Sequence, residues 1–152
     1  MNDQAKKVLS RLQNLCAKQE CCSADMMSKA TKALDGDRAG AAEVVEALIK
    51  EKYVDDARYA AAFAREKAAI TGWGPVKIRF ALAAKGIKGD AVTEALEEID
   101  GGRAEEKLRK LLESKWKTLA DDPQGKLKLI KFALSRGYEY DQIKSAVEDI
   151  TA

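Results

Sequence analysis

A spacing of 48 residues recurs along this chain and constrains its fold more than any other feature. The two prolines, Pro75 and Pro123, are 48 residues apart. One apolar triplet recurs at the same step: Leu12, Leu15 and Cys16, then Ala60, Phe63 and Ala64, then Leu108, Leu111 and Leu112. Each triplet has the i, i+3, i+4 spacing of one helix face. A repeat of this length predicts a tandem array of helical units, each packed on its neighbours.

Each repeat contains three segments of helical pattern. Alanine, leucine, lysine and glutamate dominate the composition, and no segment alternates β-branched with polar residues, so we expect an all-α protein. The expected helices are 3–19, 23–34 and 39–51, then 55–71, 75–85 and 89–99, then 102–118, 124–135 and 140–150. We expect one domain over residues 1–152, divided into repeat one (1–52), repeat two (53–101) and repeat three (102–152).

Several residues at the expected helix ends support this division. Pro75 follows the loop Gly72-Trp73-Gly74, and proline is well suited to a first helical turn. Gly86 and Gly137 each follow a basic residue, at positions where a left-handed residue commonly ends a helix. Ser23 is expected to cap the second helix of repeat one.

The arrangement of the repeats leaves two architectures open. Tandem helical triplets form an elongated, curved array with a long surface available to a partner. The alternative is a compact nine-helix globule without a groove, which sequence periodicity alone does not exclude. In either case we assign Ile78, Leu82, Val92 and Leu96 to the core, because each pair has the i, i+4 spacing of one face of its helix.

The charged residues are sorted by helix, although 27 basic and 25 acidic residues nearly balance overall. The second helices of repeats two and three lack acidic residues, whereas the third helices are mostly acidic. If the second helices line up, they form a basic stripe that attracts phosphate or an acidic protein surface. A solvated face is the alternative for any single helix. We predict that the stripe binds a partner or DNA through Lys77, Arg79, Lys85, Lys88, Lys126, Lys128, Lys131 and Arg136.

Most familiar catalytic arrangements are missing from this sequence. The chain has no histidine, so it has no histidine base and no Ser-His-Asp or Cys-His arrangement. It also has no glycine-rich phosphate loop that ends in Lys-Ser or Lys-Thr. We therefore expect a binding protein without catalytic residues or a cofactor, and an enzyme is the most distant alternative.

The three cysteines, Cys16, Cys21 and Cys22, lie close together in the sequence. We expect Cys16 to be a small core residue, and Cys21 and Cys22 to be reduced thiols in a turn. Zinc is the alternative, but it usually needs a fourth ligand, and the cysteine spacing matches no structural zinc pattern. No metal site is therefore predicted.

The opening segment carries acidic residues and lacks a long apolar stretch, which argues against a signal or transit peptide. The longest apolar runs are too short to cross a bilayer. We expect a cytoplasmic protein that does not contact a membrane.

Residues 54–96, VDDARYAAAFAREKAAITGWGPVKIRFALAAKGIKGDAVTEAL, resemble the central signature of the RecX regulatory proteins. The matching features are Asp55 and Asp56, Tyr59 and Phe63, Gly74-Pro75, Ile78, Leu82 and Lys85-Gly86-Ile87. The segment KLKLIKFALSRGYEYDQIKSAV is similar to the family's C-terminal Arg-Gly-aromatic segment, with Tyr138 as the aromatic residue. Repeat one departs from the pattern, because CSADMMSKATKAL lacks a Lys-Gly turn.

The resemblance implies a regulator of the RecA recombinase. Proteins of this family bind RecA and its filaments on single-stranded DNA. They inhibit ATP hydrolysis, strand exchange and co-protease activity, and thereby modulate DNA repair, DNA recombination and the SOS response. The eight basic residues are then expected to face the filament, and single- or double-stranded DNA is a further expected partner. The sequence leaves the oligomeric state open, with a monomer favoured, and the absence of a heptad seam argues only against a coiled-coil dimer.

Two other binding functions stay open at this stage. A general DNA-binding helical module would affect RecA only by competing for single-stranded DNA, and its affinity would depend steeply on salt. A scaffold for an unrelated acidic protein would show neither DNA affinity nor inhibition of RecA.

Overall fold

The computed structural model describes all 152 residues and is built from nine α-helices and one π-helical turn. Repeat one holds α1 (Asp3–Lys18), α2 (Ser23–Ala33) and α3 (Arg38–Lys50). Repeat two holds α4 (Asp56–Glu66), the π turn η1 (Lys67–Thr71), α5 (Pro75–Ala84) and α6 (Asp90–Glu97). Repeat three holds α7 (Gly101–Leu119), α8 (Gly125–Ser135) and α9 (Tyr140–Thr151). The expected all-α fold of three tandem three-helix repeats is confirmed.

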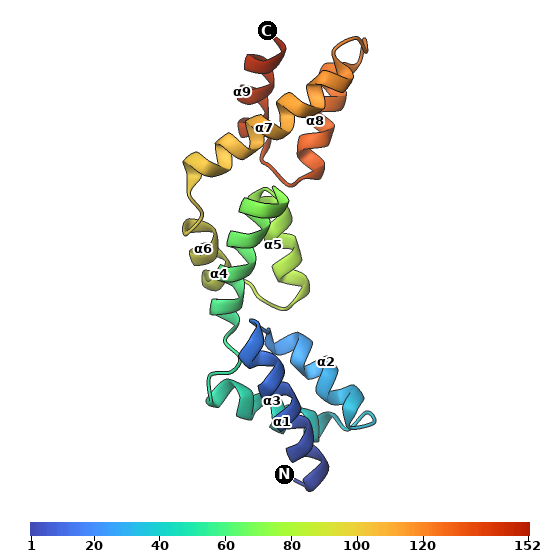
Figure 1. Cartoon of the computed structure of the whole chain (residues 1–152), viewed down its shortest axis with the longest axis vertical. Helices are drawn as coiled ribbons and strands as arrows, with labels where there is room; N and C mark the ends of the chain where they lie inside the picture. The colour runs from blue at the N-terminus through green and yellow to red at the C-terminus, as the bar shows by residue number, and fades with distance from the viewer.

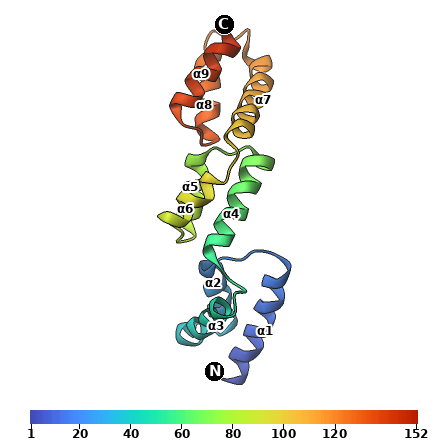
Figure 2. The ribbon, with the colours of Figure 1, turned by 90° about the vertical axis from the view of Figure 1, so that its left-hand side faces the viewer.

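The three repeats follow one another along a single long axis, with the two chain ends at opposite ends of the molecule (Figures 1 and 2). The array is elongated and gently bowed in the view of Figure 1. The alternative of a compact nine-helix globule is therefore wrong. None of the helices has both the length and the apolar composition needed to span a bilayer.

Each repeat packs its helices around its own apolar cluster. Met26 and Leu48 are fully buried in the first cluster, Ile78 and Leu82 in the second, and Leu129 in the third. Every fully buried side chain is apolar or a cysteine, so the cores depend mainly on apolar packing.

The core residues expected in repeat two are in place, with Ile78, Leu82 and Val92 buried and Leu96 half-buried against the same cluster. Cys22 is 0% exposed and also belongs to this second cluster, although it lies in the loop between α1 and α2. The second core thus includes a residue from the range given to repeat one. The exact boundaries of the repeats remain a prediction.

The expected helix 55–71 is interrupted in the structure. Its first part is α4, which ends at Glu66, and the five residues Lys67–Thr71 form the π turn. Gly72 then adopts a left-handed φ of 74°, and its N–H bonds back to the carbonyl of Lys67. A π turn is wider than an α turn, so it changes the direction of the chain without losing backbone hydrogen bonds. The helical periodicity of the sequence does not distinguish a π turn from an α turn.

The residues at the helix ends behave mostly as expected. Pro75 begins α5, and the φ angles of Gly86 and Gly137 are 74° and 88°. The prediction for Ser23 was wrong: Cys22 precedes the helix, and Ser23 is the first residue of α2. Ser23 instead donates its N–H and its hydroxyl to the carboxylate of Asp56, at 2.7 and 2.6 Å. A contact with the next repeat has replaced a local cap.

Candidate partner-binding surface

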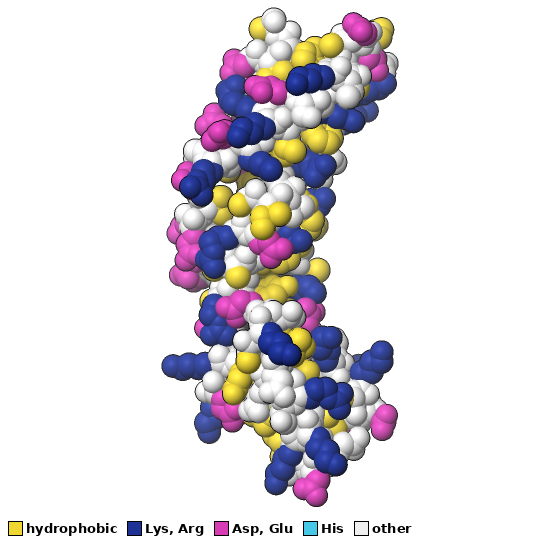
Figure 3. Space-filling model, viewed as in Figure 1, with side chains coloured by type: hydrophobic (Ala, Val, Ile, Leu, Met, Phe, Trp, Pro, Cys, Tyr) yellow, Lys and Arg dark blue, Asp and Glu magenta, His cyan; other side chains and the backbone are white.

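The second helices of the three repeats, α2, α5 and α8, follow one another along the right-hand edge of the molecule in Figure 1. Neither α5 nor α8 contains an acidic residue, and α2 contains only Asp25. Figure 3 shows dark blue lysine and arginine side chains along this edge, with hydrophobic patches between them. We call the eight predicted basic residues on and beside α5 and α8 the basic edge.

Four side chains of the basic edge are exposed and have no ion-pair partner within the chain. Arg79 lies on α5, Lys88 lies in the loop before α6, and Lys126 and Lys131 lie on α8. Cations without an internal partner keep their full attraction for an external anion. These four residues are therefore the part of the basic edge most available to a partner.

Lys85 instead joins two repeats. Its ammonium lies 2.9 and 3.0 Å from the carboxylate oxygens of Asp25. Asp25 lies on α2 of repeat one, 60 residues earlier in the chain. The hydrogen bond to Asp25 raises the pKa of Lys85. Burial opposes the charge of Asp25, but the bonds from Lys85 and Cys22 outweigh it and lower the pKa of that carboxyl. Lys85 is thus already neutralised by an internal partner.

Three further residues of the basic edge also have internal contacts. The Lys77 ammonium lies 4.6 Å from the centre of the Trp73 ring, and the Arg136 guanidinium lies 5.2 Å from that of Phe132. Lys77 and Arg136 are half-buried, but an aromatic face does not cancel their charge. Lys128 bonds to Asp122 at 2.6 Å, and this bond is the main cause that lowers the pKa of Asp122.

Sequence reasoning missed three apolar side chains on the same two helices. Phe80 on α5 is 76% exposed, and Leu127 and Leu134 on α8 are 51% and 46% exposed. Leu127, Lys131 and Leu134 have the spacing i, i+4, i+7, so they share one helix face. The sequence did contain a signal for these exposed residues, because each is an apolar residue outside the i, i+3, i+4 core set of its helix. The basic edge is therefore a mixed surface, suited to a partner with both anionic and apolar groups.

A second charged region lies between repeats two and three. A cleft of about 540 Å³ is bounded by α4, η1, the segment 98–100 that follows α6, and α7. Arg65 bonds to Glu98 across it at 3.1 Å, whereas Arg103 and Lys107 have no ion pair. Acids and bases both line this cleft, so it attracts an external anion less strongly than the basic edge does.

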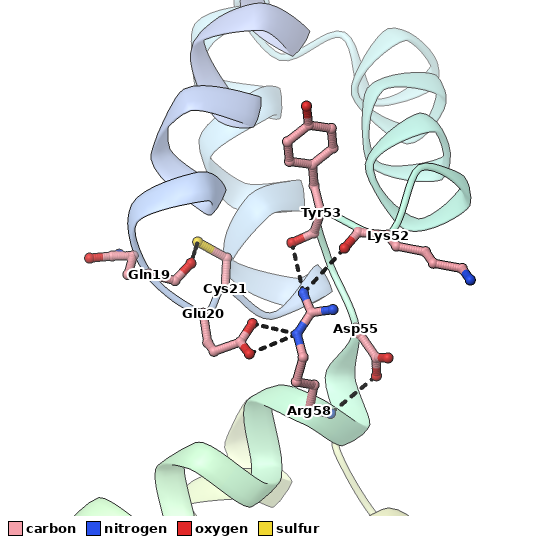
Figure 4. Close-up of polar contacts among 7 residues, drawn as sticks. All are labelled: Gln19, Glu20, Cys21, Lys52, Tyr53, Asp55 and Arg58. Carbon is pink, nitrogen blue, oxygen red and sulfur yellow. Dashed lines mark hydrogen bonds and ion pairs between the residues drawn. The ribbon is translucent and has the colours of Figure 1, made fainter.

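Arg58 organises the link between repeats one and two (Figure 4). Its Nε lies 2.7 and 2.8 Å from the two oxygens of Glu20, and this hydrogen bond raises the pKa of Arg58. Its Nη2 donates to the backbone carbonyls of Lys52 and Tyr53 at 3.2 and 3.3 Å. Asp55 caps the same helix start by accepting from the Arg58 N–H at 3.1 Å. These contacts are internal, so Arg58 is a structural cation.

The three cysteines are all buried. Burial, followed by the proximity of Cys21, raises the pKa of Cys16 to about 12, so its thiol stays neutral. Cys21 and Cys22 lie between α1 and α2 as expected, but neither is exposed. No group of three or more cysteine, aspartate or glutamate side chains is placed to hold a metal ion.

Comparison with known families and proteins identifies the architecture. Residues 55–96 match the second three-helix domain of RecX, and residues 104–147 match the third. Together the two matches take in more than half of the chain. Regulatory protein RecX of Bacillus mycoides (strain KBAB4) is 31% identical over 110 residues, which are 71% of this chain and 41% of that protein. Regulatory protein RecX of Clostridium botulinum (strain Eklund 17B / Type B) is 34% identical over 111 residues, covering 70% of this chain and 51% of that protein.

The chain thus matches about half of the length of these curated relatives, or less. Among solved structures, the crystal structure of RecX from Lactobacillus salivarius superposes with a TM-score of 0.84 and covers 99% of this chain and 98% of that one. The two sequences are 22% identical, so this likeness shows the fold. Taken with the two domain matches, these findings show that the chain belongs to the RecX family, whose curated relatives are named regulatory proteins.

Proposed function

We propose that this chain regulates the RecA recombinase by binding RecA and its filaments on single-stranded DNA. It inhibits ATP hydrolysis, strand exchange and co-protease activity, and so modulates DNA repair, recombination and the SOS response. It acts in the cytoplasm, as a monomer and without catalysis of its own. Family membership and the name of its relatives support this proposal. The observation that carries it is the pair of acid-free helices, α5 and α8, with exposed cations and apolar side chains on one edge.

A nucleoprotein filament offers what this edge can bind. Arg79, Lys88, Lys126 and Lys131 attract phosphate or acidic side chains, and the sum of several weak exposed contacts gives the effect. Phe80, Leu127 and Leu134 add apolar area that a protein surface can cover. An elongated array that touches two filament subunits also gains effective concentration for the second contact.

One observation favours the competing function of a general DNA-binding module. Phe80 is 76% exposed and adjoins Arg79, and an exposed aromatic among cations is a platform on which single-stranded bases stack. In that case inhibition of RecA would follow only from competition for the DNA. The two mechanisms differ in the amount of protein that they require.

The test is RecA-catalysed ATP hydrolysis on single-stranded DNA, with this protein titrated from far below the DNA-saturating concentration. Loss of hydrolysis at substoichiometric protein supports direct action on the filament. Loss only when the protein can coat the DNA supports the DNA-binding module. Unchanged hydrolysis at every ratio contradicts both.

A charge-reversal variant locates the surface. Replacing Arg79, Lys88, Lys126 and Lys131 by glutamate should raise the half-inhibitory concentration by about tenfold or more, because repulsion replaces attraction. The matched control reverses four exposed lysines that lie outside α5 and α8: Lys6, Lys18, Lys50 and Lys144. The control changes the net charge equally and should stay within about twofold of the wild type. Equal loss in both variants, with circular dichroism unchanged, would exclude the basic edge as the contact surface.

A further inference from the structure

A groove between α1 and α2 is not used by the proposed function. It encloses about 500 Å³, and its lining consists of Val8, Arg11, Leu12, Leu15, Lys29, Lys32 and Ala33. The four apolar residues form its floor. Its polar lining consists of three exposed cations and no acid, and none of these cations forms an ion pair within the chain. An apolar floor beside three uncompensated cations favours an occupant that carries both apolar and acidic side chains.

Each of the other two repeats carries an aromatic ring at one or two of the places that line this groove. The buried pair Met26 and Ala30 of α2 corresponds to Ile78 and Leu82 of α5 and to Leu129 and Ala133 of α8. By this register Lys29 corresponds to Phe132, which lies beneath the cations of Lys115 and Arg136.

In repeat two, the residues that correspond to Arg11 and Leu15 are Tyr59 and Phe63. Their rings stack with centroids 5.9 Å apart and pack against the second cluster. Repeat one has no ring at any of these places, because lysine, arginine and leucine stand there. In repeat three the places of Arg11 and Leu15 hold Lys107 and Leu111, so its only ring in this set is Phe132. The groove of repeat one lacks the rings of Tyr59, Phe63 and Phe132 that the other repeats carry.

The shape and charge of the groove select one kind of occupant. From Val8 to Leu15 the floor extends for about 10 Å at 1.5 Å per residue, which is two helical turns. Two or three apolar side chains of a docked helix can cover such a floor. The three rim cations require acidic side chains beside them. The lining holds no aromatic ring on which a base could stack, so single-stranded nucleic acid fits less well.

We propose that the α1–α2 groove of repeat one docks an acidic amphipathic helix of a partner protein. The groove is formed entirely by repeat one, whereas the RecX domain matches lie in repeats two and three. The groove shares no residue with the basic edge on α5 and α8. The docking proposal can therefore fail without affecting the proposed action on RecA, and the reverse also holds.

The first test uses a defined probe and the full chain. The probe is a fluorescein-labelled 16-residue peptide with leucine at i, i+3, i+4 and i+7 and glutamate elsewhere. Fluorescence anisotropy at physiological ionic strength should show saturable binding. A peptide with the same composition and a scrambled order should bind at least about tenfold more weakly, because it has no apolar face. Absence of saturable binding, or equal binding of both peptides, overturns the proposal.

Two variants test the groove itself. Lys29→Glu with Lys32→Glu should weaken binding of the probe by about tenfold or more. Lys29→Phe, which copies the ring of Phe132 in repeat three, should close the groove and abolish binding while leaving the helical content and the urea midpoint unchanged. The matched control, Lys6→Glu with Lys50→Glu, reverses two exposed lysines outside the groove and should bind normally. Equal weakening in the control, or normal binding by Lys29→Phe, overturns the proposal.

A nucleic-acid occupant is distinguished by competition. An unlabelled 20-nucleotide single strand should not displace the peptide at equal concentration. If it does, and if Lys29→Phe weakens binding of the oligonucleotide as much as binding of the peptide, the groove takes nucleic acid and the proposal fails.

Discussion

The two junctions between the repeats are held together by different parts of the chain. At the first junction, between repeats one and two, the bonds involve side chains: Arg58 with Glu20, Lys85 with Asp25, and Ser23 with Asp56. No backbone-to-backbone hydrogen bond joins the helices of repeat one to those of repeat two. The geometry of this junction therefore depends on charge and on rotamers.

At the second junction, between repeats two and three, the backbones bond directly. The N–H of Gly74 donates to the carbonyl of Arg136 at 2.7 Å, and the N–H of Val76 donates to that of Gly137 at 2.9 Å. The buried hydroxyl of Tyr138 adds a bond to the carbonyl of Gly72 at 3.0 Å. Such a close approach requires glycine, since a Cβ on Gly74 would lie 2.5 Å from the Tyr138 nitrogen.

The difference has a consequence for the charged surface. By the register of the buried residues, Asp25 corresponds to Lys77, and Lys85 corresponds to Arg136. An acid–base pair at the first junction is thus replaced by two cations at the second. Because the backbone holds the second junction, these side chains need not pair with each other. A junction made of backbone bonds leaves its surface charge available to a partner.

The largest expected effect comes from a side chain at the backbone junction. In Gly137→Ala, the new Cβ would lie 2.5 Å from the backbone nitrogen of Lys77, at a φ of 88°. Left-handed strain and overpacking together should cost about 2–5 kcal/mol of the free energy of unfolding, measured by urea denaturation.

The repeat itself supplies the control for this substitution. Gly86 is the counterpart of Gly137, with a φ of 74°, but a Cβ added to Gly86 would meet no other atom within 4 Å. Gly86→Ala should therefore cost only the strain, about 1–2 kcal/mol. Equal losses in the two variants would show that the close backbone approach contributes nothing.

A smaller loss is expected from Tyr138→Phe. The substitution keeps the ring but leaves the carbonyl of Gly72 without the hydroxyl that bonds to it in a buried place. The free energy of unfolding should fall by about 1–2 kcal/mol in urea denaturation. Tyr140→Phe is the control, because Tyr140 is 55% exposed, and it should change nothing measurable. If Tyr138→Phe also leaves the free energy of unfolding unchanged, the hydroxyl does not stabilise this junction.

The ion pair at the first junction should contribute less. Asp25 and Lys85 keep 39% and 35% of their side-chain surface exposed, so solvent screens their attraction. A double-mutant cycle with Asp25→Asn and Lys85→Met should give a coupling energy of about 0.2–1 kcal/mol. The coupling should shrink in about 1 M salt, where the Debye length is near 3 Å. A coupling that salt leaves unchanged would indicate packing in place of charge.

The smallest effect is a pH dependence confined to the same pair. The folded chain holds the pKa of Asp25 below its ordinary value of 3.8. The contribution of the pair is therefore present above that value and is lost as the pH falls through the lower, folded pKa. The difference in free energy of unfolding between the wild type and Asp25→Asn should vanish on acidification. In a Lys85→Met background the difference should already be small at neutral pH, and persistence there would contradict this origin.

The sequence by itself determined the helices and the order of the repeats. Apolar residues at i, i+3 and i+4, Pro75 at a helix start, and Gly86 and Gly137 at helix ends are local signals. They act within one or two turns of chain, so they can be recognised without knowledge of the fold. All expected helix ends lie within two residues of the observed ones, except at the π turn that interrupts the fourth helix.

The tertiary structure alone decided which charges are available. Arg79 and Lys85 are both basic residues on one acid-free segment, but Lys85 meets Asp25, 60 residues away, and Arg79 meets no acid. The open groove of repeat one and the backbone bonds of Gly74 likewise depend on contacts between distant segments. The physical reason is that charge pairing and close packing depend on distance in space, whereas helix formation depends on neighbours along the chain.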